Sequence, residues 1–193
     1  MAKTNGRKIP EVLSGDELDA LLSQPNTRYP TGKRNLALMA VMSDAGLRVS
    51  EALNLEARDV NFNTGKIKVR QGKGDKDRIL WTGARTLSWL QSWLEVRPPG
   101  AGKLFTTLKG LPLQSRYVRA MVKRYAAKAG VEKDVHPHTL RHSFGTDLYN
   151  QTKDIRLVQK MLGHADLSTT MIYTHIIDDD AEEAMKSLRL NAR

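Results

Sequence analysis

The feature that most restricts the fold of this chain is the segment Lys33–Ala45, KRNLALMAVMSDA, which is apolar on nearly all sides of a helix. Such a helix cannot lie on a surface, because it has no polar face to turn toward water. Gly46 follows directly and is suited to end the helix, because glycine adopts left-handed backbone angles without a steric penalty. The segment therefore predicts a mainly helical domain built around one buried helix.

Start and stop signals predict further helices on both sides of this segment. Ser14 and Glu17 form a capping box before a helix that ends ahead of Pro25. Residues 26–32 are expected to form a loop, and a short helix is expected from about Ser50. The remaining helices are predicted over 84–96, 114–129, from 137 or 138 onward, 154–163, from 168 onward and 179–190.

One stretch changes period from helix to strand. In KIKVRQ, Ile67 and Val69 alternate with basic residues, and 77–82 (DRILWT) follows as a second short strand. The glycine-rich stretch 72–75 joins the two strands as a hairpin loop. The expected fold class is therefore mainly α with a small antiparallel β-sheet (α+β).

Composition narrows the functional classes. The chain has 193 residues and a formal net charge of +10, which points to a polyanionic partner. Nucleic acid is favoured over an anionic membrane surface, because no basic amphipathic anchor stands out and no apolar run could span a bilayer. The chain has no cysteine, which excludes disulfides, thiolate metal sites and a cysteine nucleophile.

The predicted helix 114–129 concentrates positive charge. It carries five basic residues and no acidic one, on either side of an apolar stripe. Like charges at helical spacing repel, so an anionic partner or solvent must offset them. A solvated basic face is one interpretation, and a face turned toward the DNA backbone or a groove is the preferred one. The candidate DNA-binding residues are Arg116, Arg119, Lys123 and Arg124.

Two arginines and a histidine form a candidate phosphate site. His138 and Arg141 lie three residues apart on a predicted helix, so both project to the same side. Arg48 lies at the break between two predicted helices, which would hold its guanidinium rigidly. Two fixed guanidiniums can bind both non-bridging oxygens of one phosphate and favour a transition state with more charge on them. A salt bridge to Glu51 or Asp44 is the alternative for Arg48.

Three further residues could supply the other groups that strand cleavage requires. Tyr173 can be the nucleophile if a base or a cationic surrounding assists its phenol, whose ordinary pKa is about 10. His138 and His164 can donate to the phosphate oxygens or exchange a proton with the nucleophile. Lys73, between glycines on the hairpin loop, can protonate the leaving 5′-oxygen. The alternative for Lys73 is a solvated turn lysine.

The histidines also permit a metal interpretation. His138 and His142 have the i, i+4 spacing of a zinc pair, and His136 and His164 could add ligands. The glutamate of a His-Glu-x-x-His motif is missing between them. We therefore expect no metal, and a zinc-dependent hydrolase stays an alternative that chelator sensitivity would support.

Taken together and in order, these motifs resemble the tyrosine recombinase (phage integrase) family, and most closely its Xer type. The resemblance covers about Val12 to the C-terminus and implies the catalytic-domain fold of that family. It implies an enzyme that cleaves and rejoins double-stranded DNA without cofactor or metal. The motifs are Arg48 in GLRVSEALNL, Lys73 in GKGDKDR, HTLRH at 138–142, LGH at 162–164 and Tyr173 in TTMIYTH.

The resemblance implies roles around the scissile phosphate. Arg48 and Arg141 would bind the phosphate, and Lys73 would be the general acid for the 5′-hydroxyl. Glu51 is similar to the buried acidic residue of the family, which orients the site and does no chemistry.

The resemblance also implies the nucleophile and its helpers. His138 would be the general base toward Tyr173, and His164 would donate to the transition state. Tyr173 would form a 3′-phosphotyrosyl link that conserves the energy of the phosphodiester.

By the same resemblance, residues 1–11 would be a basic arm and 12–193 the catalytic domain. The helical core-binding domain usual in the family is absent, so the chain is expected to be a catalytic fragment or a naturally short recombinase. Family members exchange a C-terminal helix between protomers, which implies a homo-oligomer (a tetramer) on DNA, with Asp179–Leu190 as the exchanged helix. The implied location is the cytoplasm of a prokaryote, with a phage or mobile element as a possible source of the gene.

Two other functions stay open. A type IB-like topoisomerase would nick and reseal DNA without exchanging partners. A DNA-binding regulatory module would keep the fold with a vestigial site, although the intact set of motifs argues against this.

Overall fold

The computed structural model of the chain describes residues 11–70, 77–163 and 185–186. It is mostly helical with one two-stranded antiparallel sheet, which confirms the predicted fold class. The described elements are α1 (Gly15–Leu22), α2 (Pro30–Asp44), α3 (Val49–Asn54), the 3-10 turn η1 (Ala57–Asp59), β1 (Lys66–Val69), β2 (Arg78–Trp81), α4 (Ala84–Leu94), α5 (Ser115–Lys128), α6 (Pro137–Thr152) and α7 (Ile155–Leu162).

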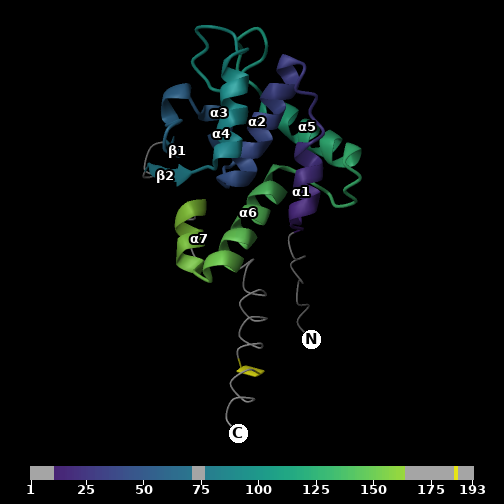
Figure 1. Cartoon of the computed structure of the whole chain (residues 1–193), viewed down its shortest axis with the longest axis vertical. Helices are drawn as coiled ribbons and strands as arrows, with labels where there is room; N and C mark the ends of the chain where they lie inside the picture. Colours follow the sequence, from purple (N-terminus) through teal and green to yellow (C-terminus); the bar gives the residue numbers. More distant parts are fainter. Residues whose placement is uncertain (1–10, 71–76, 164–184, 187–193) are drawn as a thin grey trace, which may run out of the picture.

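Helix α2 is the central helix that its apolar sequence predicted. It packs against α1, α3, α4 and α6 (Figure 1). Every residue from Arg34 to Ser43 is buried. Gly46 has a φ of +60°, as expected of a glycine just past a helix end. A Cβ at this glycine would lie 2.3 Å from Cδ1 of Phe144, so the turn also allows α6 to approach.

The N-terminal end of α2 corrects the prediction. The helix begins at Pro30, so residues 30–32 belong to the helix and not to the loop. Proline is well suited to the first helical position, because its amide hydrogen would have no partner there. A Cβ at Gly32 would lie 1.9 Å from the carbonyl oxygen of Asn26. Pro30 and Gly32 therefore belong to the first turn of α2 and are not part of a loop.

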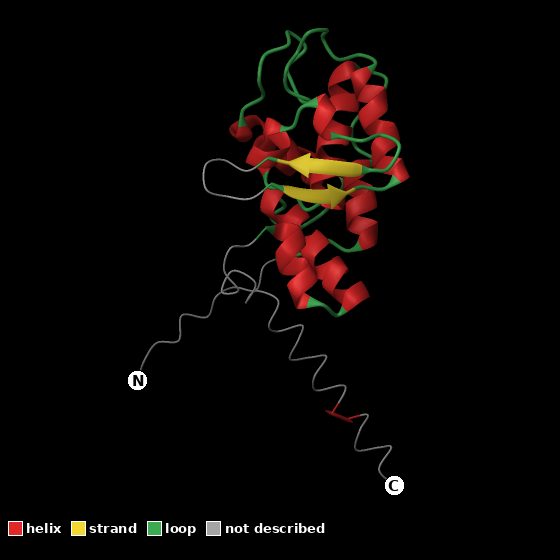
Figure 2. Ribbon diagram, turned by 90° about the vertical axis from the view of Figure 1, so that its left-hand side faces the viewer, coloured by secondary structure: helices red, strands yellow, loops and turns green. Residues whose placement is uncertain are grey.

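The sheet has the predicted pairing of inward and outward residues. Strands β1 and β2 run antiparallel, with Ile67 opposite Leu80. These two side chains are fully buried, whereas Ile79 and Trp81 point outward and are exposed. The sheet lies on the outside of the molecule with helices behind it (Figure 2).

Three helix ends follow the predicted capping residues. The Ser14 hydroxyl accepts from the Glu17 N–H, and the Glu17 carboxylate accepts from the Ser14 N–H. Asp154 accepts from two amides at the start of α7, and Gly163 follows α7 with a φ of +62°. Helix α6 starts at Pro137, one of the two predicted starts, and His136 is its cap, which the sequence analysis did not predict.

The two tryptophans of α4 differ in burial. Trp93 is fully buried, and its indole N–H donates to the Leu104 carbonyl at 2.8 Å. Trp89 is half-buried, and the guanidinium of Arg85 stacks over its ring, 4.7 Å from the centroid.

Three predicted segments lie outside the described residues. These are the hairpin loop 72–75, the helix from 168 and the helix 179–190, of which the structure describes Met185 and Lys186 alone. Among the described residues, no helix is long and apolar enough to cross a membrane.

Candidate active site

The carboxylate of Glu51, in the first turn of α3, is the centre of a group of arginines. It accepts from the Arg48 backbone N–H at 2.7 Å and from Arg48 Nη1 at 2.8 Å. Arg78 donates to both of its oxygens, each at 2.9 Å. Nη1 of Arg141 lies 3.8 Å from Glu51 Oε2. We call Arg48, Arg78 and Arg141, gathered around Glu51, the arginine cluster.

The charge state of Glu51 follows from these contacts. Burial by itself raises the pKa of the Glu51 carboxyl. Hydrogen bonds from Arg78 and from the Arg48 backbone, together with the charge of Arg78, outweigh that effect and hold the pKa below its ordinary value. Glu51 is therefore ionised at neutral pH, and its carboxylate holds Arg48 and Arg78 in place.

Arg141 is held between two helix ends. Its side chain is almost fully buried on α6. Nη1 donates to the Gly46 carbonyl at 2.6 Å, after α2, and Nη2 donates to the Leu162 carbonyl at 2.5 Å, at the end of α7. A guanidinium held on both sides has little freedom to move, as rigid phosphate recognition requires.

Arg48 combines the two interpretations that the sequence left open. Its salt bridge to Glu51 is present, whereas Asp44 instead accepts from the Gly83 N–H at 2.8 Å. Nη2 of Arg48 also donates to the Gly163 carbonyl at 3.1 Å. The side chain is nevertheless 36% exposed. The salt bridge therefore positions a guanidinium that solvent, and hence a ligand, can reach.

Arg78 belongs to this cluster, and the sequence analysis missed it. It begins β2, and its side chain is 10% exposed. The strand alternation contained the signal, because Arg78 lies two residues before the buried Leu80 and so shares its inward face. An arginine on the buried face of a strand needs acceptors, and Glu51 and the Met161 carbonyl, at 3.1 Å from Nε, supply them.

His138 lies at the surface in the first turn of α6, beside the arginine cluster. Partial burial of the ring lowers its pKa, and the positive charges of His136, Arg141, Arg119 and Arg48 lower it further. The imidazole is therefore neutral at pH 7 and can accept a proton, as a general base must.

The other two histidines on α6 have structural surroundings. His136 caps the helix, and its Nδ1 accepts from the Thr139 N–H at 3.3 Å. Burial, followed by the charges of His138 and Arg141, lowers the pKa of His142 to about 4. His142 Nδ1 is buried and has no hydrogen-bond partner among the residues that the structure describes. Within the described ranges, no three histidine, aspartate or glutamate side chains are grouped as metal ligands.

Helix α5 presents the predicted basic face beside this site. The apolar stripe of the helix contains the buried residues Val118, Met121, Val122 and Tyr125, and Ala129, just past the end of α5, is half-buried. The charge of Arg119 reaches His138, which places this side of α5 next to the candidate site. The basic face consists of Arg116, Arg119, Lys123 and Arg124, all exposed.

Four of the residues predicted for the site are thus brought together, namely Arg48, Glu51, His138 and Arg141. Lys73, His164 and Tyr173 lie outside the described residues. Two of them lie close to parts of the cluster in sequence. His164 follows Gly163, which accepts from Arg48, and Lys73 precedes Arg78 in the sequence between β1 and β2.

Comparison with known proteins identifies this arrangement. The pattern of the phage integrase family matches residues 11–179. The tyrosine recombinase XerD of Staphylococcus saprophyticus is 42% identical over 176 residues, which are 88% of this chain and 59% of that protein. The chain thus spans about three fifths of the length of this curated relative.

Solved structures agree with the sequence matches. The XerH site-specific recombinase, in a post-cleavage complex with its palindromic difH substrate, has a TM-score of 0.81 and 35% identity over 95% of this chain and 55% of that chain. The catalytic domain of bacteriophage HP1 integrase has a TM-score of 0.64 over 92% of this chain and 94% of that chain; at 22% identity it supports the fold alone. The chain belongs to the phage integrase family of tyrosine recombinases and has the fold of their catalytic domain.

Proposed function

We propose that this chain is the catalytic part of a site-specific DNA recombinase that cleaves and rejoins strands through a 3′-phosphotyrosyl intermediate on Tyr173. The arginine cluster carries this proposal. An ionised Glu51 holds two guanidiniums of separate helices near each other, and a neutral imidazole lies beside them. That combination suits a phosphate whose oxygens gain charge in the transition state.

The proposed reaction assigns one step to each group. Arg48 and Arg141 bind the non-bridging oxygens, and His138 accepts the proton of Tyr173 as its oxygen attacks phosphorus. The bond from phosphorus to the 5′-oxygen breaks, and Lys73 protonates the leaving oxygen while His164 donates to the phosphorane. The reverse steps, with the 5′-hydroxyl of a partner strand, rejoin the DNA. No metal or nucleotide takes part.

Double-stranded DNA is the proposed substrate. The formal net charge of +10 and the exposed basic face of α5 favour a polyanion, and the related XerH has been solved bound to its difH substrate. Such a recombinase would work in the prokaryotic cytoplasm, where this DNA lies.

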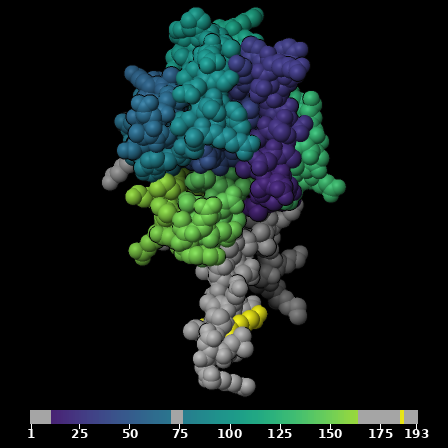
Figure 3. Space-filling model, in the orientation of Figure 1, coloured from purple at the N-terminus to yellow at the C-terminus, as the bar shows by residue number. Residues whose placement is uncertain are grey.

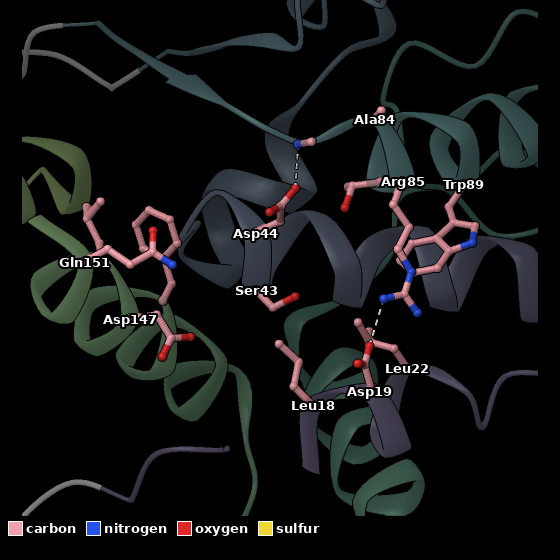
Figure 4. A pocket seen from close by; sticks show the side chains of 14 residues that line it. Leu18, Asp19, Leu22, Ser43, Asp44, Ala84, Arg85, Trp89, Asp147 and Gln151 are labelled. Carbon is pink, nitrogen blue, oxygen red and sulfur yellow. Dashed lines mark hydrogen bonds and ion pairs between the residues drawn. The ribbon is translucent and has the colours of Figure 1, made fainter. Parts of the chain in front are cut away.

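We also propose that protomers exchange the segment Asp179–Leu190 on DNA. A cleft of about 440 Å³ between α1, α2, α4 and α6 is the proposed acceptor (Figures 3 and 4). Its apolar lining includes Leu18, Leu22, Trp89, Phe144 and Leu148.

The exposure of an apolar side chain on the exchanged segment supports this acceptor. Asp19, Asp44 and Asp147 also line the cleft, and burial raises the pKa of Asp147. Figure 4 shows Asp147 reaching in from α6 and Trp89 from α4. Met185, on the predicted apolar side of the exchanged segment, is 55% exposed in the single chain. The apolar side of the segment would therefore meet the apolar lining of the cleft.

Cross-linking tests the exchange, because the chain has no native cysteine. Protomers carrying Leu148→Cys are mixed on DNA with protomers carrying Met185→Cys, and a short bis-maleimide is added. We expect a cross-linked dimer of the two variants. Tyr29→Cys, at an exposed position of the N-cap of α2 outside the cleft, replaces Leu148→Cys as the control. Equal cross-linking of both pairs would contradict the proposed acceptor.

A strand-exchange assay in EDTA tests the proposed function against topoisomerase activity. Two DNA molecules with one attachment site each are incubated with the chain, and both relaxation and recombinant products are measured. We expect recombinants without metal. Relaxation of supercoils without recombinants would indicate the topoisomerase, and loss of all activity in EDTA would indicate a metal-dependent hydrolase.

A further inference from the structure

We propose that Arg78 is a positioning residue of the active site, which ties the return strand of the hairpin to the start of α3 and to the end of α7. This inference rests on the proposed function. Arg78 touches no described group that would react. It instead joins the three segments that lead to Lys73, Arg48 and His164.

The hydrogen bonds of Arg78 join three segments, namely β2, the start of α3 and the end of α7. Nη1 and Nη2 bind both oxygens of Glu51, each at 2.9 Å. Nε donates to the Met161 carbonyl at 3.1 Å, in the last turn of α7. These bonds use the fork of the guanidinium on one side and Nε on the other. A lysine at this position could not make all three, because its donors share one nitrogen.

The end of α7 is shaped around this side chain. A Cβ at Gly163 would lie 2.9 Å from Nη1 of Arg78 and 3.0 Å from its Cζ. The guanidinium therefore packs directly against the backbone that precedes His164. The same Gly163 carbonyl accepts from Arg48, so Arg78 and Arg48 act on one turn. Loss of Arg78 would loosen the turn that also holds Arg48.

Charge explains why a third arginine is useful there. Glu51 positions Arg48, and its carboxylate also lies 3.8 Å from Arg141. Without Arg78, this carboxylate would cancel part of the positive charge that the other two arginines offer to a phosphate. Arg78, at 10% exposure, neutralises Glu51 from the protein side. The two remaining guanidiniums keep their charge for the substrate.

The primary test compares Arg78→Lys with the wild type on a suicide DNA substrate. Single-turnover cleavage and the DNA dissociation constant are measured on the same preparations. We expect cleavage to fall about 10²-fold, as a misplacement of about 1 Å can cause, with the dissociation constant nearly unchanged. Cleavage close to wild type would overturn the proposal, and so would a parallel loss of binding, which would indicate a direct DNA contact.

Arg34→Lys is the matched control. Arg34 is also a buried arginine with several hydrogen bonds, to the Thr106 carbonyl, to Asn35 and to the Tyr117 hydroxyl. It lies on α2 and contacts none of the arginine cluster in the described contacts. We expect it to lose stability as Arg78→Lys does, while folded protein cleaves at the wild-type rate. Equal loss of cleavage in both variants would reduce the role of Arg78 to stability.

A double-mutant cycle tests whether Arg78 acts through Glu51. We expect Glu51→Gln to slow cleavage and to make the further change Arg78→Gln nearly without effect. Multiplicative losses would show that Arg78 acts independently of Glu51 and would overturn the proposed route.

Hydrogen exchange without DNA separates this proposal from the proposed function. We expect Arg78→Lys, but not Arg34→Lys, to speed amide exchange at the C-terminal end of α7. If the wild type cleaves no DNA while Arg78→Lys speeds exchange at the end of α7, the proposed function is wrong and the positioning role of Arg78 is supported. If the amides of α7 exchange in Arg78→Lys at the wild-type rate, the proposed positioning role of Arg78 is wrong, whatever the cleavage activity.

Discussion

At the scale of single residues, the site depends on a few side chains whose charge states are set by their neighbours. Glu51 stays ionised among arginines, while His138 and His142 stay neutral. All three pKa values are lowered. Burial is the largest cause for the two histidines, and the same positive charge that stabilises a carboxylate also disfavours a protonated imidazole. The site therefore contains a fixed carboxylate, Glu51, and a neutral imidazole, His138, that can accept a proton.

The low pKa of His142, about 4, predicts a pH-dependent stability. The unfolded chain protonates this histidine near pH 6.5 and the folded chain near 4, so its contribution is complete above pH 6.5 and is lost as the pH falls toward 4. We expect the wild type to lose about 2 kcal/mol of unfolding free energy from this group between pH 7 and 4.5. His142→Asn should lack that part of the loss.

Urea unfolding of both proteins at several pH values measures this difference. Glu51 and the other carboxyl groups titrate in both proteins, so the comparison isolates His142. Parallel stability profiles between pH 7 and 4.5 would contradict the prediction.

Gly163 provides a second residue-scale prediction. Alanine there must adopt a φ of +62° and also place a Cβ against Arg78. The left-handed backbone costs about 1–2 kcal/mol, and overpacking adds about 1–3 kcal/mol. Gly130→Ala is the matched control, because its φ is +71° and nothing lies within 4 Å of the added Cβ. We expect Gly163→Ala to lose clearly more unfolding free energy. Equal losses would show that Arg78 moves aside without penalty.

At the scale of elements, local signals predicted most helices and both strands. The capping box at Ser14, the glycine after α7 and the alternation in β1 each depend on neighbouring residues alone, and the structure confirms them. The predicted start of α2 was wrong, because proline and glycine occur in the first turn of a helix as well as in loops.

The sequence motifs predicted most of the candidate site, and there is a physical reason why they did not predict Arg78. Arg48, Glu51, His138 and Arg141 were named, whereas Arg78 was not. Its importance depends on Glu51 and Met161, which are 27 and 83 residues away along the chain. A local pattern can show that an arginine faces inward, but it cannot show which acceptors the fold brings to it.

The basic face of α5 predicts how DNA binding depends on salt. Each phosphate contact that is lost reduces the slope of log K against log salt concentration by about 0.9. We expect Arg119→Gln to lower the slope by that amount for any DNA sequence, because the contact is to the backbone. Arg85→Gln removes the same charge from α4, where the arginine is paired with Asp19, and should leave the slope unchanged. Equal slopes for the two variants would contradict a DNA-facing α5.

At the scale of the whole molecule, the fold gathers one site from distant parts of the chain. Helix α2 forms the centre of the fold (Figure 1). Hydrogen bonds and ion pairs of the arginine cluster join the ends of α2 and α7 to the N-terminal halves of α3 and α6. We expect this site to transfer a DNA phosphate to Tyr173.

The most direct measurement is covalent trapping on a nicked suicide substrate in EDTA, with Tyr173→Phe run beside the wild type on a denaturing gel. We predict a DNA–protein adduct for the wild type, with the DNA joined through its 3′-phosphate to the peptide that contains Tyr173. Tyr173→Phe should bind the DNA equally and form no adduct. An adduct that persists in Tyr173→Phe, or none from wild-type protein that is folded and bound to the substrate, would contradict the claim.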